Sequence, residues 1–177
     1  LMASRLVQAN EHFYSQIGVG YGVWKPMSID DYQSEPLRNV ENASTSVLVS
    51  ATLKILNNHA LRMGYFNWNQ TETAEHQTAD VTLHYFGLDV MSLVIPESAV
   101  SPYVSYGLST VFYKEDSGDL MQAGPGYQMG AGLYLHLHRR ISFTAEYRFL
   151  YLMLPDQVGR TNNYSGPILS TSLHVCF

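Results

Sequence analysis

The last eleven residues of the chain alternate between two kinds of side chain. Residues 167–177 read P-I-L-S-T-S-L-H-V-C-F. On an extended chain, one face carries Leu169, Thr171, Leu173, Val175 and Phe177, and the other carries Ile168, Ser170, Ser172, His174 and Cys176. A strand that crosses a membrane in a β-barrel needs this alternation, because one face meets lipid and the other faces a polar lumen.

The same alternation recurs along the chain and predicts seven further strands. They cover residues 14–24, 47–56, 61–66, 80–94, 103–113, 128–138 and 141–151. In the first strand, Gly18, Gly20 and Gly22 face inward, as a narrow and curved barrel wall favours. In 80–94 the apolar face changes side, and we expect a β-bulge near Gly87 to reconcile the two halves. The fold class predicted is all-β: an eight-stranded antiparallel up-and-down transmembrane β-barrel over residues 12–177, preceded by a periplasmic segment over 1–11.

The connections between these strands alternate in length. Long polar stretches follow every odd-numbered strand, and short turns follow the even-numbered ones. We interpret the long stretches 25–44, 67–78, 114–125 and 155–166 as loops. Bacterial outer-membrane barrels have short periplasmic turns and longer extracellular loops. The pattern therefore predicts the outer membrane, with both termini in the periplasm.

Composition agrees with a membrane barrel and excludes some other classes. Hydrophobic residues make up 46% of the chain, but they alternate with polar ones and form no run near the roughly 18 apolar residues of a transmembrane helix. Charged residues make up only 14%, which is low for a water-soluble surface, although a soluble β-sandwich remains an alternative. The net charge of −5 argues against a nucleic-acid partner, and the single Cys excludes an intrachain disulfide framework. The chain begins at Leu1, and we expect a removed secretory signal upstream.

Two motifs resemble those of a known family. The segment G-A-G-L-Y-L-H-L-H-R-R-I-S-F-T-A-E-Y-R-F, residues 130–149, is similar to the penultimate hairpin of OmpA-like barrel domains of the OmpA and OmpX type. The segment S-P-Y-V-S-Y-G, residues 101–107, resembles a strand start of that family, and Phe177 resembles its terminal aromatic residue. The resemblance implies the eight-stranded fold and says little about activity, because such motifs belong to the fold.

The inward faces of the predicted strands carry several polar and charged residues. An eight-stranded barrel is too narrow for a water-filled pore, so inward charges are expected to pair and plug the lumen. We expect Glu146 to pair with Arg62, Lys54 or a neighbour such as Arg148. A hydrogen-bonded gate that opens to a narrow conduit is the functional alternative. The lumen set comprises Lys54, Arg62, Gln128, His136, His138, Glu146, Arg148 and His174.

The inward histidines raise the question of a metal site or an enzyme. His136 and His138 lie about 7 Å apart along one strand, but a third ligand from His174 would have to reach across the lumen, so we expect neither a metal nor another cofactor. Lipid A deacylases of similar size place His and Ser two residues apart on a lipid-facing strand, and this chain has no His-x-Ser pair. Cys176 could be a reactive thiol, but a buried small residue is the simpler interpretation.

The sequence therefore favours a structural or interaction role in the outer membrane. A narrow channel or carrier for small solutes is the alternative, and a lipid-modifying enzyme is a third. The expected partners are outer-membrane lipid, the barrel assembly machinery that would recognise Phe177, and a surface or subunit partner that contacts the four loops.

Overall fold

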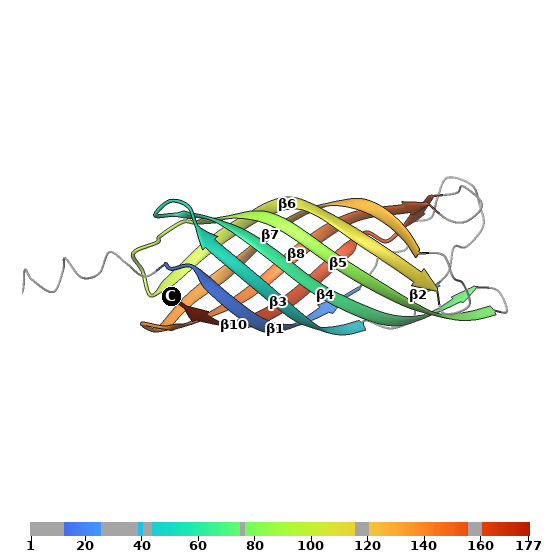
Figure 1. Ribbon diagram of the computed structural model, residues 1–177, viewed down its shortest axis with the longest axis horizontal. Helices are drawn as coiled ribbons and strands as arrows, with labels where there is room; N and C mark the ends of the chain where they lie inside the picture. The colour runs from blue at the N-terminus through green and yellow to red at the C-terminus, as the bar shows by residue number, and fades with distance from the viewer. Residues whose placement is uncertain (1–12, 26–38, 41–43, 75–76, 116–120, 156–160) are drawn as a thin grey trace, which may run out of the picture.

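The computed structural model describes residues 13–25, 39–40, 44–74, 77–115, 121–155 and 161–177. Eight long antiparallel strands form a closed barrel, because the last strand pairs with both the first strand and the one before it (Figure 1). These strands are β1 (Gln16–Trp24), β3 (Ser44–Lys54), β4 (His59–Ala74), β5 (Gln77–Leu93), β6 (Val100–Glu115), β7 (Met121–His138), β8 (Ile141–Pro155) and β10 (Gly166–Cys176). Two short strands, β2 (Asn39–Val40) and β9 (Thr161–Asn163), pair with β4 and β8. The predicted fold class is confirmed.

The pairing of the strands fixes the tilt of the barrel. One row of paired residues can be followed around the wall from β8 back to β8. It runs Ser142, His174, Gly18, Ser50, Gly64, Gly87, Ser109, Gly126 and Leu152. The row returns ten residues further along β8, from Ser142 to Leu152. Such a stagger requires the strands of a barrel to be tilted, typically by about 35–45° from its axis.

The two ends of the barrel differ. The short connections 55–58, 94–99 and 139–140 lie at one end, together with the start of β1 and the C-terminus (Figure 1). We call this the turn end, and the opposite end, where β1 finishes and β3 begins, the loop end. No described residue belongs to a helix that could cross a membrane. The predicted segment 1–11 lies outside the described residues.

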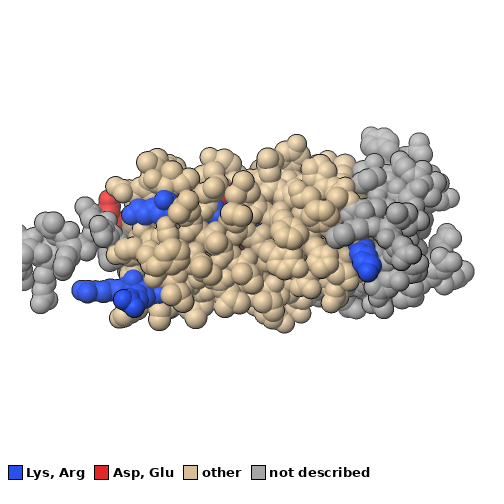
Figure 2. Space-filling view, in the orientation of Figure 1, with Lys and Arg blue, Asp and Glu red and all other residues tan. Residues whose placement is uncertain are grey.

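Side chains alternate between the lumen and the outer surface as predicted. Outward residues such as Val19, Leu133 and Leu173 are exposed, whereas their inward neighbours are buried. The charged residues with described side chains are either buried in the lumen or placed toward the ends of the strands and in the connections. In Figure 2 the middle of the visible face is almost entirely uncharged, and the exposed basic side chains gather toward the two ends. An uncharged apolar band of this kind matches a surface that faces lipid.

Two of the predicted loops are largely strand, so those predictions were wrong. The stretch 67–78 belongs to β4 and β5 except for residues 75–76, which are outside the described part, and 114–125 belongs to β6 and β7 except for 116–120. β4 and β5 have 16 and 17 residues, whereas about 9–11 suffice to cross a membrane. Toward the loop end the polarity of the two faces reverses: Asn67 and Asn69 face outward, and Trp68 faces the lumen. A polar outer face made this stretch look like a loop.

The loops 25–44 and 155–166 contain more order than expected where the structure describes them. The short strand β2 lies within the first, and β9 lies within the second. Residues 26–38, 41–43 and 156–160 lie outside the described part.

The predicted bulge near Gly87 is also wrong. The pairing of β5 with β4 and with β6 continues through Gly87 without a shift. One face of β5 points inward without a break from Val81 and Leu83 to Leu93, the part of the strand whose side chains the structure describes. The apparent change of side arose because the lumen near the loop end is apolar. A shift in pairing occurs instead between His136 and His138, where β7 meets β8.

The end of β3 differs in one further detail. The strand predicted over residues 47–56 ends earlier: β3 ends at Lys54, and Leu56 lies exposed in the turn that follows. Lys54 itself is half-buried at the turn end.

Candidate functional site

A network of charged and polar side chains crosses the middle of the lumen. Its first part joins neighbouring strands: Arg62 on β4 donates through Nε to Asp89 Oδ2 on β5 at 2.9 Å. The two residues are paired in the sheet, so their side chains point inward at the same level. Both are buried.

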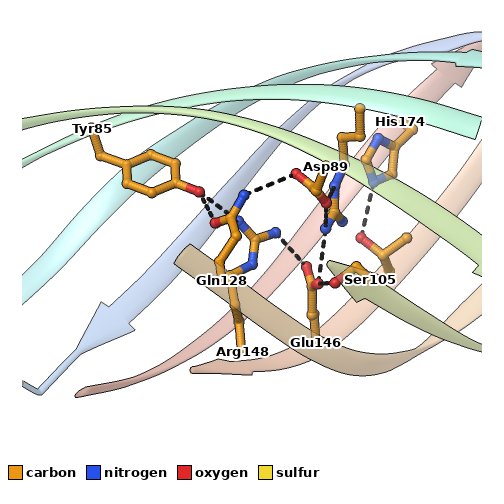
Figure 3. A network of polar contacts seen from close by, with 9 residues as sticks. Tyr85, Asp89, Ser105, Gln128, Glu146, Arg148 and His174 are labelled. Atoms are coloured by element: carbon orange, nitrogen blue, oxygen red, sulfur yellow. Dashed lines mark hydrogen bonds and ion pairs between the residues drawn. The ribbon is translucent and has the colours of Figure 1, made fainter. Parts of the chain in front are cut away.

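Glu146 on β8 connects this pair to the opposite wall. Its Oε1 accepts from Arg62 Nη2 at 2.8 Å, and its Oε2 accepts from Arg148 Nη2 at 2.8 Å. Ser105 on β6 donates to the same Oε1 at 2.6 Å. The carboxylate therefore lies between two guanidinium groups, and all of its polar neighbours are buried (Figure 3).

Gln128 and Tyr85 complete the network on the side nearer the loop end. Arg148 Nη1 donates to Gln128 Oε1 at 3.0 Å and to the Tyr85 hydroxyl at 3.1 Å. Tyr85 donates to the same Gln128 oxygen, and Gln128 Nε2 donates to Asp89 Oδ1 at 3.3 Å. The network thus has two guanidinium groups and two carboxylates, so its formal charges cancel. Buried ions are tolerated when they are paired and hydrogen-bonded in this way.

Apolar side chains fill the lumen on both sides of the network. The cluster toward the loop end, which we call the upper cluster, contains Trp24, Leu48, Phe66, Trp68, Val81, Leu83, Tyr85, Val111, Tyr113, Leu150, Leu152, Leu154, Tyr164 and Ile168. The lower cluster, toward the turn end, contains Phe13, Ala60, Met91, Leu93, Tyr103 and Tyr134. Tyr85 stacks on Phe66 with ring centroids 4.0 Å apart, and the Arg62 guanidinium lies 5.9 Å from the centroid of Tyr103. Aromatic rings therefore border the ionic layer on both sides.

Glycines on β7 make room for the large side chains. A Cβ at Gly130 would lie 2.9 Å from Glu146 Oε1, and a Cβ at Gly132 would lie 2.7 Å from Cζ of Tyr103 and 2.4 Å from the Ala145 carbonyl oxygen. Only a residue without a side chain fits at Gly132 unless its neighbours move. The Gly-x-Gly pattern of this strand thus has a packing role.

A second polar group lies among the side chains of the turn end. Ser142 on β8 donates to Gln16 Oε1 on β1 at 2.7 Å, and Cys176 Sγ lies 3.7 Å from the same oxygen. His174 Nε2 lies 3.0 Å from the Thr144 hydroxyl. All five residues are buried. Cys176 is accordingly a buried thiol rather than an exposed one.

The remaining histidines of the predicted lumen set lie at the turn end. His136 is half-buried, and its ring lies 6.1 Å from that of Tyr14. His138 follows the pairing shift at the end of β7 and is exposed, not inward as expected. Within the described residues no three His, Cys, Asp or Glu side chains gather as metal ligands would.

The structure brings together only part of the predicted lumen set. Arg62, Gln128, Glu146 and Arg148 meet in one network, whereas Lys54, His136, His138 and His174 do not join it. Asp89, Tyr85 and Ser105 were missed. Strict alternation of side chains from Val81 to Leu93 would have placed Asp89 inward. The assumption that apolar residues face lipid broke that alternation, and the inward position of Asp89 was not recognised.

Comparisons with known proteins agree on the barrel. A family model described as "Outer membrane protein beta-barrel domain" matches residues 1–173. A search of curated protein sequences found no match. Among solved structures, Neisserial surface protein A superimposes with a TM-score of 0.69 at 19% identity, covering 94% of this chain and 98% of that one.

Two further solved structures are similar over nearly their whole length. OprG from Pseudomonas aeruginosa has a TM-score of 0.65 at 11% identity, with 93% of this chain and 96% of that chain covered. Ail, the attachment invasion locus protein of Yersinia pestis, has a TM-score of 0.57 at 13% identity, with coverages of 92% and 97%. At these identities the likeness concerns the fold.

Proposed function

The chain belongs to the outer membrane protein β-barrel family of the bacterial outer membrane, and we propose that it acts there as a plugged barrel with a structural or interaction role. Its lumen would be closed, and its loop end would meet partners outside the cell. The observation that carries the proposal is the position of Glu146, held between Arg62 and Arg148 in the middle of the lumen.

The packing around this ionic layer supports a closed lumen. A conducting pore needs a continuous polar path, whereas here a large aromatic cluster lies on one side of the ions and a smaller apolar cluster lies on the other. Opening would require breaking buried ion pairs, which costs several kcal/mol when one partner is left alone. A narrow channel or carrier remains the rival proposal.

The polar groups of the lumen are better suited to packing than to catalysis. Thr144 and His174 form a hydroxyl–imidazole pair at 3.0 Å, but both are buried in the lumen and neither faces lipid. The other buried acids and bases are occupied in ion pairs with each other. We therefore propose a barrel without enzymatic activity.

The orientation and partners follow from the two ends of the barrel. We propose that the turn end, with Phe177, faces the periplasm and that the loop end faces outward. The strands β4 to β7 are longer than a membrane crossing requires. Their ends, together with the loops 25–44 and 155–166, would form the surface that meets a partner.

Removing the protein from its bacterium distinguishes the two roles. Cells that lose a structural barrel should become more permeable, with greater sensitivity to detergent and faster entry of a hydrophobic dye. Cells that lose a channel should instead take up small solutes more slowly. Restoration by the wild-type chain is the control, and slower uptake with an intact detergent barrier would contradict the proposal.

A further inference from the structure

The tip of the β7–β8 hairpin carries an imidazole and two guanidinium groups in consecutive positions at the turn end. They belong to His138, Arg139 and Arg140, and all three residues are exposed. Among the described residues, none of these side chains makes a hydrogen bond or an ion pair. Figure 2 shows basic side chains projecting from this end, at the left of the view. The tip is therefore a cationic surface that the described part of the protein leaves unpaired.

The backbone around this tip is ordered by pairing on both sides. The pairing of β7 with β8 shifts between His136 and His138, and a β-bulge of this kind redirects the side chain that follows it. On the other side, the backbone N–H of Cys176 donates to the carbonyl oxygen of Arg140 at 2.9 Å, so the last strand is tied to the turn. The cationic side chains thus project from a turn of defined position.

Apolar side chains lie directly beside the basic ones on the outer face of the barrel. Leu137 and Ile141 flank the turn and are 61% and 40% exposed. Ile141 pairs with Val175 of β10, which is also exposed, and Phe177 follows that strand with its ring outward. Basic side chains at the edge of a lipid-facing band extend to the level of the lipid headgroups. The surface therefore fits a lipid molecule whose acyl chains contact the apolar residues and whose headgroup meets the guanidinium groups.

The two ends of the barrel differ in charge, and this difference selects the kind of lipid. The stretches 25–44, 67–78, 114–125 and 155–166 belong to the loop end of the chain's strand order and contain ten acidic and four basic residues. The three short connections of the turn end contain Arg139, Arg140 and one acidic residue, Glu97. Among the described ion pairs, none joins Glu97 to either arginine. An anionic headgroup is consequently attracted to the turn end and repelled by the loop end.

We propose that the tip of the β7–β8 hairpin is a docking surface for the phosphate of an anionic phospholipid in the leaflet that surrounds the turn end. Arg139 and Arg140 donate to the phosphate oxygens, which match the planar donors of a guanidinium group. The contact deepens the proposed structural role, because it holds the barrel at a defined depth in the membrane. Its assignment to the periplasmic leaflet rests on the orientation proposed above.

Selectivity for lipid headgroups tests this surface. The wild-type barrel and two double variants are folded in phosphatidylcholine vesicles that contain a trace of spin-labelled phosphatidylglycerol or spin-labelled phosphatidylcholine. Electron paramagnetic resonance gives the relative association constant of each labelled lipid at the protein surface. Arg139→Gln with Arg140→Gln removes the proposed donors. Lys25→Gln with Lys114→Gln is the matched control, because it removes two exposed cations from the loop end. The shift of each variant on an unheated gel checks its folding.

The docking surface predicts that the wild-type barrel prefers phosphatidylglycerol to phosphatidylcholine. The preference should fall by at least about threefold when both arginines are replaced, and it should stay at the wild-type value in the lysine control. A wild-type barrel without preference would overturn the proposal. Equal losses in the two double variants would overturn it as well, because the attraction would then depend on net charge alone.

A measurement on the wild-type barrel keeps the test independent of the variants. Raising the ionic strength from about 0.01 M to about 1 M shortens the Debye length from roughly 30 Å to 3 Å, so the preference for phosphatidylglycerol should weaken. A preference that salt leaves unchanged would contradict an ionic contact. Both leaflets of the vesicles contain the same lipids, so these results do not depend on the direction of insertion or on whether the lumen conducts.

Discussion

Arg62 on β4 and Glu146 on β8 meet across the lumen, with Arg62 Nη2 2.8 Å from Glu146 Oε1. Neither strand neighbours the other in the sheet, so the contact joins two separate parts of the wall. Glu146 also holds Arg148 on its own strand at 2.8 Å. The carboxylate of Glu146 is thus the point at which the two guanidinium groups of the network converge.

Replacement of Glu146 should destabilise the barrel strongly. Glu146→Ala leaves Arg62 and Arg148 short of a buried counter-charge, and losing one partner of such a pair typically costs about 3–5 kcal/mol. The free energy of unfolding in urea, measured in lipid vesicles, provides the value. In the double variant with Arg62→Ala the two losses should fall short of additivity by roughly 0.5–3 kcal/mol.

Lys54→Ala supplies the control for this cycle. Lys54 also faces inward, but it is half-buried at the turn end and takes no part in the network. The change in the free energy of unfolding caused by Lys54→Ala should therefore add to the change caused by Glu146→Ala, with no coupling between them. Additive losses with Arg62, Arg148 and Lys54 alike would contradict the network.

Placement of a charge on the outer face should have a cost that depends on depth. Leu133 and Leu137 both lie outward on β7, the first within the apolar band and the second near the turn end. An arginine on the lipid face costs about 2–4 kcal/mol at the middle of the membrane and about 0–1 near its edge. Leu133→Arg should therefore lower the free energy of unfolding in vesicles much more than Leu137→Arg. Equal effects would refute the assignment of the lipid face.

Two inward glycines should respond oppositely to alanine. At Gly132 a new Cβ would lie 2.4 Å from the backbone oxygen of Ala145 and against the ring of Tyr103, so Gly132→Ala should destabilise the barrel. At Gly64 the Cβ meets nothing within 4 Å, and Gly64→Ala should be neutral or stabilising by up to about 1 kcal/mol. The measurement is the urea midpoint for unfolding of the two variants in vesicles. A fall in the midpoint for Gly64→Ala as large as that for Gly132→Ala would contradict this packing of the lumen.

Deletion of Phe177 separates stability from assembly. Its ring is outward and 73% exposed, while its backbone N–H donates to the Ser15 carbonyl at 2.9 Å. Burial of such a ring in lipid is worth at most about 1.5–3 kcal/mol, so refolding in vitro should be nearly intact. If the assembly machinery recognises Phe177, insertion in cells should fall severely. Small and equal effects in both assays would exclude a targeting role.

Much of the fold could be predicted from the sequence because a lipid-facing strand leaves a strict pattern. In β10 every second residue from Leu169 to Val175 faces outward, as the alternation indicated, and so does Phe177 directly after the strand. The alternation misled where its premise, that apolar side chains face lipid and polar ones face the lumen, does not hold. Near the loop end the lumen is apolar and the outer face is polar, so Trp68 was assigned to a loop, and Leu83 and Tyr85 seemed to require a bulge.

The candidate site was harder to predict because pairing across the lumen depends on the stagger of the whole barrel. Both Lys54 and Arg62 face inward, and the sequence offered no means to choose between them as the partner of Glu146. Asp89 was missed together with the phase of its strand. A shift of pairing at the end of β7 turned His138 outward, and alternation alone could not reveal it.

Single-channel recording in planar bilayers tests the closed lumen most directly. The purified barrel, shown to be folded and inserted, should produce no steady unitary current, because the Arg62–Glu146–Arg148 layer and the apolar clusters beside it block the passage of ions. Steady and reproducible current steps from the wild-type protein would contradict the plugged barrel and would favour the channel instead.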